Sequence, residues 1–174
     1  MRVFIGPPLQ ESFERFYGFS KEECLKAIDY YHEYFSEKGL YENEVYLGVP
    51  DLLASLKQAG KQLIVATSKP EEFSIQILKH FGLYDYFDFV AGATMDRKRS
   101  KKSDVIQYAL EQNGITDLAH TIMIGDREHD VLGAQAQKFD SIGVLYGFGS
   151  REELEEAGAT YIAQEVGEIA AFIG

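Results

Sequence analysis

Two aspartates after a short apolar run are the residues of this chain best suited to catalysis. Asp126 directly follows the run Ile122–Gly125, and Asp130 comes four residues later, where an amphipathic stretch begins. In a parallel α/β protein this spacing places both carboxylates at the carboxyl edge of the sheet, where such sheets bind ligands. Mg²⁺ is held by one or two carboxylates together with substrate phosphates. The pair therefore predicts a magnesium site, although Asp130 is also suited to cap its helix.

Hydroxyl and ammonium groups upstream of the aspartates could bind the phosphate. Thr67 and Ser68 follow the apolar run at 63–66, so their hydroxyls and the adjacent N–H groups could reach a phosphate oxygen. Lys102 precedes an amphipathic stretch, where a cation could neutralise phosphate charge, and Lys101 is a second candidate for that role. Each residue alone has an ordinary explanation, because hydroxyl residues often cap helices and most lysines lie at the surface.

Apolar runs alternate with amphipathic stretches from residue 62 onward, which predicts strands and helices in alternation. This alternation predicts an α/β fold, a Rossmann-like parallel sheet covered by helices on both faces. Strands are expected at 63–66, 87–90, 121–124, 141–144 and, at one edge, 160–162. Helices are expected at 51–59, 71–80, 103–112, 130–137, 151–157 and 166–172.

The first 46 residues are rich in aromatic side chains and contain no run typical of a buried strand. Ser20 and Glu23 have the spacing of a capping box, and helices are expected at 8–17 and 21–38. We therefore expect a partial helical cap over residues 1–46 and an α/β core over residues 47–174. Four aromatic residues at helical spacing indicate a face packed between the two helices. They are Tyr30, Tyr31, Tyr34 and Phe35.

Composition limits the classes of partner. The formal net charge of −11 disfavours nucleic acid and anionic membranes as partners. No apolar run approaches the ~20 residues of a membrane span, and the start of the chain lacks the apolar stretch of a secretory signal. Cys24 is the single cysteine, which excludes an internal disulfide and favours a cytoplasmic location. Residues 97–102 hold five cations, and we expect at least one of these lysines to face an anionic substrate.

In order and spacing these segments resemble the haloacid dehalogenase-like phosphohydrolases. Thr67–Pro70 matches the second motif of that family, Lys102 matches the third, and Gly125–Asp130 matches the fourth. Ile142–Leu154 is similar to the final strand and loop of the phosphoglycolate phosphatase and 5'-nucleotidase branch. Phe4–Leu9 is similar to a loop in the helical cap of that branch. The resemblance covers nearly the whole chain.

The resemblance implies a Mg²⁺-dependent phosphatase that hydrolyses small phosphomonoesters, phosphoglycolate-like or nucleotide-like, through an aspartyl-phosphate. It implies that Thr67, Ser68 and Lys102 bind the phosphate, with Thr67 and Lys102 taking part in catalysis. Asp126 would be a ligand of Mg²⁺, and Asp130 would be a second ligand or would hold a metal-bound water. The expected partner is a small phosphorylated substrate, over which the cap would close.

One motif of the family is absent from this sequence. The family's first motif, Asp-x-Asp at the end of the first strand, supplies the nucleophile and the general acid/base, and this chain contains no Asp-x-Asp. A strand, a turn and a first cap helix would need about 40 residues. We therefore expect the nucleophile to lie outside this chain, the sheet to lack its central strand, and the chain alone to be inactive. The exposed strand edges would favour a homodimer.

Three alternatives differ in the expected activity. A non-catalytic relative would bind or regulate without a nucleophile, and a phosphosugar mutase of the same family would share every motif found here. A phosphoacceptor signalling domain also gathers Asp, Thr and Lys at a sheet edge. In that class the acidic residues precede Thr and Lys, whereas here they follow, so the signalling class is disfavoured. The motifs do not distinguish among phosphomonoester substrates.

Overall fold

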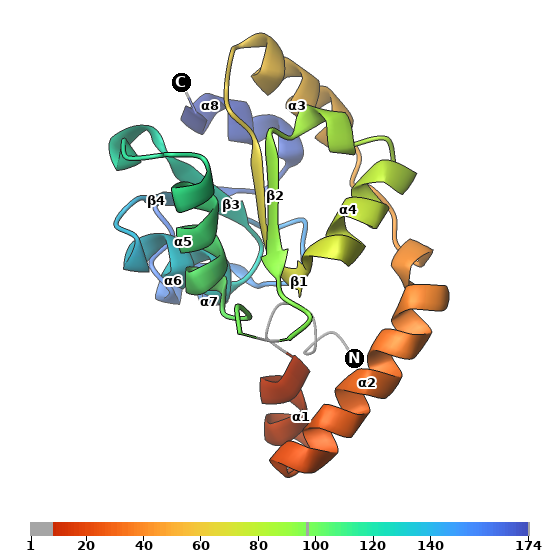
Figure 1. Ribbon diagram of the computed structural model, residues 1–174. Helices are drawn as coiled ribbons and strands as arrows, with labels where there is room; N and C mark the ends of the chain where they lie inside the picture. The colour runs from red at the N-terminus through yellow and green to blue at the C-terminus, as the bar shows by residue number, and fades with distance from the viewer. Residues whose placement is uncertain (1–8, 97, 174) are drawn as a thin grey trace.

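The strands of the protein form two separate parallel sheets in the computed structural model, which describes residues 9–96 and 98–173. The first sheet has the order β1-β2 and the second has the order β3-β4-β5, and every pair is parallel. Helices flank both sheets (Figure 1), which confirms the α/β class. The strands are β1 (Ile64–Pro70), β2 (Phe89–Ala93), β3 (Ile122–Gly125), β4 (Asp140–Val144) and β5 (Tyr161–Ala163).

The helices agree with the predicted ones to within two residues, except at the carboxyl end. There a 3₁₀ turn and a short α-helix replace the single predicted helix. The α-helices are α1 (Leu9–Tyr17), α2 (Lys21–Glu37), α3 (Val49–Gln58), α4 (Glu71–His80), α5 (Lys102–Gln112), α6 (Glu128–Ala136), α7 (Arg151–Glu156) and α8 (Ile169–Ile173). The 3₁₀ turns are η2 (Gly39–Tyr41), η3 (Tyr84–Tyr86), η4 (Leu118–His120) and η5 (Val166–Glu168).

β1 and β2 differ from the predicted strands by more than one residue at an end. β1 runs on to Pro70, with an irregularity in its pairing between Ala66 and Pro70. β2 begins at Phe89, because the side chain of Asp88 takes the place of a strand hydrogen bond. The Asp88 carboxylate accepts hydrogen bonds from Leu63 N (2.8 Å) and from Lys57 Nζ (2.7 Å). A pattern of apolar residues does not report such local capping.

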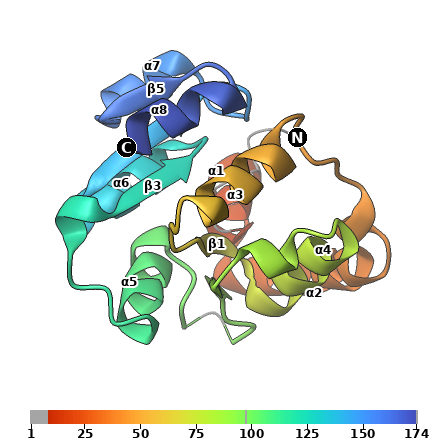
Figure 2. The same cartoon turned by 90° about the horizontal axis from the view of Figure 1, so that it is seen from above.

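Helices α3 and α5 join the two sheets. α5 packs against β1, β2 and α6, and its Val105 and Ala109 form a buried cluster with Ala91 of β2. On the other side, Leu52 of α3 packs against a second cluster built around Ile142 of β4. Figure 2 shows α3 and α5 beside the first sheet, with the second sheet and α6–α8 to one side. The core is thus shared between the sheets through helices. No helix in 9–96 or 98–173 is long and apolar enough to cross a membrane.

β1 and β3 are the facing edges of the two sheets. Within the described residues they are not hydrogen-bonded to each other, yet Ala66 of β1 and Met123 and Ile124 of β3 line the same cavity. The absent central strand expected from the resemblance would occupy this position. Unpaired edges of this kind offer backbone donors and acceptors to another strand.

The helical segment lies at the carboxyl ends of β1 and β2, where α1 and α2 form an angled pair (Figure 1). The predicted capping box is present, with Ser20 at the N-cap of α2 and Glu23 accepting from Ser20 N at 2.8 Å. Of the similarity at Phe4–Leu9, residues 4–8 lie outside the described part. The division into cap and core at residue 46 stays a prediction.

The predicted role of the aromatic stripe on α2 is wrong. Tyr30 and Tyr34 are exposed, whereas Phe35 contacts Phe73 of α4 and stacks on Tyr31. α1 instead packs against α2 through other residues, among them the buried Cys24, whose Sγ lies 3.8 Å from a backbone carbonyl of α1. Helical spacing identified the stripe but not which neighbour it faces, and half of it faces the cavity.

Candidate active site

All five site residues predicted from the sequence line one cavity of about 450 Å³ at the carboxyl ends of β1 and β3. Its floor is the space between the two sheets, and its far wall comes from α1, α2 and α4. The structure therefore brings together side chains that are up to 63 positions apart in sequence (130 minus 67). These residues are Thr67, Ser68, Lys102, Asp126 and Asp130.

Of the two lysines proposed for the phosphate, Lys102 is the one that lines the cavity. It is the first residue of α5, and its Nζ donates to Ala66 O at 2.9 Å and contacts Asp130 Oδ1 at 2.8 Å. An ammonium group has three hydrogens, so one remains for a ligand oxygen. Lys101, the alternative candidate, is exposed and does not line the cavity.

Asp130 is buried and engaged at both carboxylate oxygens. Oδ1 pairs with Lys102, and Oδ2 accepts from Arg127 N at 3.2 Å, which caps α6. The glycine at position 125 permits this arrangement, because a Cβ there would overlap the Asp130 carboxylate. Asp130 thus does cap its helix, as its sequence position allowed, and it also holds Lys102 in place.

Asp126 lies at the end of β3 and is held by the loop after β4. Its Oδ2 accepts from Phe148 N at 2.8 Å, and its carbonyl oxygen accepts from Gly149 N at 2.9 Å. A Cβ at Gly147 would overlap the Asp126 side chain. Burial, with Asp126 and Tyr46 nearby, raises the pKa of Tyr146 to about 12, so its hydroxyl stays protonated beside this carboxylate.

The two hydroxyl residues follow the regular part of β1. Thr67 Oγ1 accepts a hydrogen bond from Lys69 N at 3.1 Å, which closes a tight turn at the end of the strand. Its own hydroxyl hydrogen has no acceptor within 9–96 and 98–173, so it can be donated to a ligand in the cavity. Ser68 lines the cavity beside it.

The metal site that the resemblance implies is incomplete within the described part of the chain, where no cluster of three or more His, Cys, Asp or Glu residues is found. Asp126 fits a hard cation, because only one of its carboxylate oxygens accepts a hydrogen bond from a described residue. Asp130 fits less well, since both of its oxygens already have protein partners.

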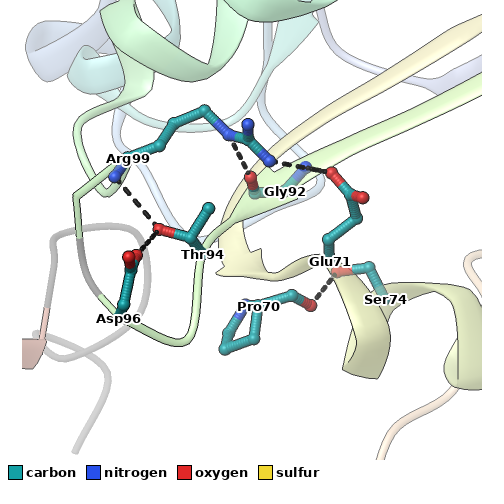
Figure 3. A network of polar contacts seen from close by, with 7 residues as sticks. All are labelled: Pro70, Glu71, Ser74, Gly92, Thr94, Asp96 and Arg99. Atoms are coloured by element: carbon teal, nitrogen blue, oxygen red, sulfur yellow. Dashed lines mark hydrogen bonds and ion pairs between the residues drawn. The ribbon is translucent and has the colours of Figure 1, made fainter.

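A polar network anchors the loop that leads to Lys102 (Figure 3). The guanidinium of Arg99 donates to Gly92 O at 2.9 Å and to Glu71 Oε2 at 3.0 Å, and it stacks on the Tyr108 ring at 3.5 Å. Glu71 Oε2 also accepts from Gly92 N at 3.1 Å. Thr94 Oγ1 accepts from Arg99 N at 3.1 Å. The network joins the end of β2, the start of α4 and the loop at 94–101.

Sequence reasoning missed three residues of or around the site. Arg99 belongs to the cationic run at 97–102, of which only a lysine was expected to reach the substrate. Lys69 and Tyr146 fall in segments that entered only through the family resemblance. Their roles depend on contacts that sequence spacing does not reveal.

Comparisons with known proteins agree with this geometry. Residues 1–144 match the sequence profile of the family described as haloacid dehalogenase-like hydrolase. A 5'-nucleotidase of Pseudomonas aeruginosa is 41% identical over 163 residues, which cover 94% of this chain and 73% of that protein. A predicted phosphatase from Clostridium acetobutylicum superposes with a TM-score of 0.95 at 52% identity, covering 99% of this chain and 79% of that chain.

A relative with a different name also matches. The tyrosine-protein kinase PtkA of Mycobacterium tuberculosis is 38% identical over 160 residues, covering 91% of this chain. The chain spans about half the length of that protein, 53%.

Proposed function

Because the chain belongs to the haloacid dehalogenase-like hydrolase family, we propose that it forms the phosphate-binding part of a Mg²⁺-dependent phosphatase. The substrates would be small phosphomonoesters, phosphoglycolate-like or nucleotide-like, and the nucleophile would lie outside this chain. The observation that carries the proposal is the convergence of Thr67, Lys102 and Asp126 on one cavity. Anionic phosphate would meet one hydroxyl and one ammonium there.

The described residues would bind and orient the phosphoryl group. Thr67 donates its free hydroxyl hydrogen and Lys102 donates its third N–H, while Ser68 can add a further hydroxyl. These donors are fixed before substrate arrives, since Lys102 is held by Ala66 O and Asp130. Preorganised donors aimed at developing negative charge supply much of the rate enhancement in phosphoryl transfer.

Asp126 would hold Mg²⁺, with Asp130 as a second ligand or as the holder of a metal-bound water. When bound, the cation neutralises phosphate charge and fixes the orientation of the transferring group. Asp126 and Asp130 are the two carboxylates that the described residues bring to the cavity, and we propose that further ligands come from the substrate phosphate and from outside this chain.

The nucleophile would come from a strand between β1 and β3. A parallel strand in that position would end beside Thr67 and Asp126, where an Asp-x-Asp could face the cavity. A carboxylate oxygen would then bond to phosphorus as the bond to the leaving-group oxygen breaks, and the second aspartate would protonate that oxygen. Water would hydrolyse the aspartyl-phosphate and release inorganic phosphate.

The proposal is tested by comparing this chain with a longer protein that includes an upstream Asp-x-Asp strand. We expect the longer protein to release phosphate from small phosphomonoesters in the presence of Mg²⁺, and the 174-residue chain to show negligible turnover. Asp126→Asn in the longer protein should reduce kcat/KM by about 100-fold or more. Asp117→Asn, the same change at an exposed aspartate paired with His120, should leave activity unchanged.

Three results would contradict the proposal. If the longer protein fails on a broad panel of phosphomonoesters while still binding phosphate, a non-catalytic binding or regulatory role replaces it. If a sugar phosphate is isomerised with no net release of phosphate, the phosphosugar mutase alternative replaces it. Robust Mg²⁺-dependent turnover by the 174-residue chain would contradict the placement of the nucleophile.

A further inference from the structure

Lys69 is a cation in the cavity that the proposed chemistry leaves unused. It follows the hydroxyl residues at the end of β1 and lines the cavity. Its ammonium makes no hydrogen bond and no ion pair within 9–96 and 98–173, and its contact is with the face of the Phe35 ring, 4.3 Å from the ring centroid. The side chain is partly buried. A desolvated charge without a partner is costly unless a ligand supplies the counter-charge.

The surroundings of Lys69 set it apart from the phosphate-binding lysine. Phe35 belongs to α2 of the helical segment, and its ring also contacts Phe73 of α4 at 5.7 Å. Lys102 instead contacts Ala66 of β1 and Asp130 of α6. Both lysines line the cavity, but the Lys69 ammonium lies against the helical segment through Phe35, whereas the Lys102 ammonium lies against β1 and α6.

The charge of the protein makes this cation distinctive. The chain carries a net charge of −11, and the other lysine of the cavity, Lys102, is matched by Asp130. Burial lowers the pKa of the Lys69 ammonium, as expected for a cation that lacks a counter-ion. Lys79 makes a similar ring contact, with Tyr84 at 4.9 Å, but it is exposed and outside the cavity.

We propose that Lys69 and Phe35 form a leaving-group subsite that binds a second anionic group of the substrate, a carboxylate or a second phosphate. This inference rests on the proposed function, which places the phosphoryl group at Lys102. It selects among the proposed substrates: phosphomonoesters with an anionic leaving group are favoured over those with a neutral one, such as a nucleoside. Lys69 is thus a specificity-determining residue. The Phe35 ring covers its ammonium, and the reduced contact with water strengthens its attraction to an anion.

The test is a binding experiment with the 174-residue chain in Mg²⁺, measured by isothermal titration calorimetry. The probes are inorganic phosphate, 2-phosphoglycolate, 1,2-ethanediol bisphosphate and 2-hydroxyethyl phosphate, which has a neutral leaving group. We expect 2-phosphoglycolate or the bisphosphate to bind about 10-fold tighter than 2-hydroxyethyl phosphate, the usual size of one charge-assisted contact. Whichever of the two binds tighter identifies the anionic group.

Three variants separate a binding role from a structural one. Lys69→Met, which keeps an apolar side chain against Phe35, should abolish the preference and leave inorganic phosphate affinity within about 2-fold. Lys69→Arg keeps the charge and should keep the preference, which guards against a general loss of folding. Lys79→Met, the matched control at an exposed lysine over a tyrosine ring, should behave as the wild-type chain.

Each contrary result has a distinct meaning. If the wild-type chain does not bind inorganic phosphate, the proposed function fails and this subsite falls with it. If phosphate binds but Lys69→Met keeps the preference, the subsite alone is overturned. An equal loss of affinity for all four probes in Lys69→Met would place Lys69 on the phosphoryl group and overturn its assignment to the leaving group.

Discussion

At the scale of single residues, the pairing of Lys102 with Asp130 is the most constrained contact of the site. The two side chains are 13% and 10% exposed, and their charged atoms lie 2.8 Å apart. Removal of one partner from a buried pair leaves an uncompensated charge, and this costs more than the pair itself contributes. The pair should therefore behave as one unit when it is mutated.

We predict that Asp130→Asn and Lys102→Met each lower the free energy of unfolding by about 3 kcal/mol, because each leaves one buried charge unpaired. The double variant should lose clearly less than the sum, as measured by urea denaturation. The exposed pair Arg151 and Glu155, 3.0 Å apart, is the control and should show far smaller losses. Additive losses from Asp130→Asn and Lys102→Met would contradict the coupling.

The sequence identified the residues that are proposed to bind phosphate and metal better than it identified the contacts around them. Thr67 and Asp126 were found because an apolar run ending in a polar residue marks the carboxyl edge of a strand. Lys102 was found because it precedes a predicted helix and matches the third family motif. The choice between Lys101 and Lys102 was not available, since both precede the same helix and differ only in which way the side chain points. Lys69 was invisible because its significance lies in the ring of Phe35, 34 positions earlier (69 minus 35).

At the scale of elements, the helices were predictable because amphipathic spacing and caps are local in sequence. α4 matches its prediction at both ends, Glu71 and His80. Strand ends were less predictable, because pairing partners and side-chain capping decide them. The shift of β2 to Phe89 follows from Asp88, whose carboxylate is committed to Lys57 and Leu63.

Asp88 should give the fold part of its resistance to acid. Hydrogen bonds from Lys57 and from Leu63 N lower the pKa of its carboxyl below the ordinary value of 3.8. A carboxyl whose pKa is lower in the folded state stabilises the fold above its unfolded pKa, and this contribution is lost as the pH falls through the folded pKa.

We therefore predict that Asp88→Asn flattens the decline in unfolding free energy below about pH 4. The measurement is urea denaturation at a series of pH values between 2 and 7. Asp117→Asn is a useful comparison, because the pKa of Asp117 is also lowered, by His120, but that pair joins no two elements that are distant in sequence. If the unfolding free energy of Asp88→Asn fell with decreasing pH as steeply as that of the wild-type chain, the prediction would be contradicted.

The Arg99 network should fix the loop that carries Lys102. We predict that Arg99→Met speeds amide exchange across residues 94–101 by about 10-fold or more, because it removes the contacts with Gly92, Glu71 and Tyr108. Arg99→Lys should rescue this only in part, since an ammonium cannot donate in the planar fork of a guanidinium.

Lys98→Met is the matched control in the same loop, because Lys98 is exposed and, among residues 9–96 and 98–173, its ammonium pairs with Asp96 alone. It should leave exchange at Gly92 and Thr94 unchanged. Hydrogen exchange followed by mass spectrometry resolves the segment. Equal acceleration by both variants would show that Arg99 has no special role in holding the loop.

At the scale of the whole molecule, the divided sheet is the main departure from a regular α/β fold. The resemblance led us to expect two facing strand edges, and the structure has β1 and β3 in that relation, without hydrogen bonds between them. The sequence alone could not show how the halves would stay together. α5 supplies part of that answer, because it packs against β1, β2 and α6. α3 supplies the rest, because its Leu52 packs on the Ile142 cluster and its Lys57 pairs with Asp88.

The unpaired strand edges should affect the rate of amide hydrogen exchange and the tendency of the chain to dimerise. We predict that amides of β1 and β3 exchange on the order of 100-fold faster than those of β4, which is paired on both sides and buried at Ile142. We also expect a concentration-dependent dimer in sedimentation, because edges favour pairing. Equal protection of all three strands would contradict the edge assignment.

Lys102 gives the divided sheet a mechanical property. Its ammonium contacts Ala66 of β1, in the first sheet, and Asp130 of α6, which packs on the second sheet. A single nitrogen atom therefore links the two sheets. Chemical modification of that amine, or a bound anion that draws it away from Ala66 and Asp130, would weaken the contact between the two sheets. It would also weaken the binding of anions in the cavity. The angle between the two sheets should thus respond to occupancy of the cavity.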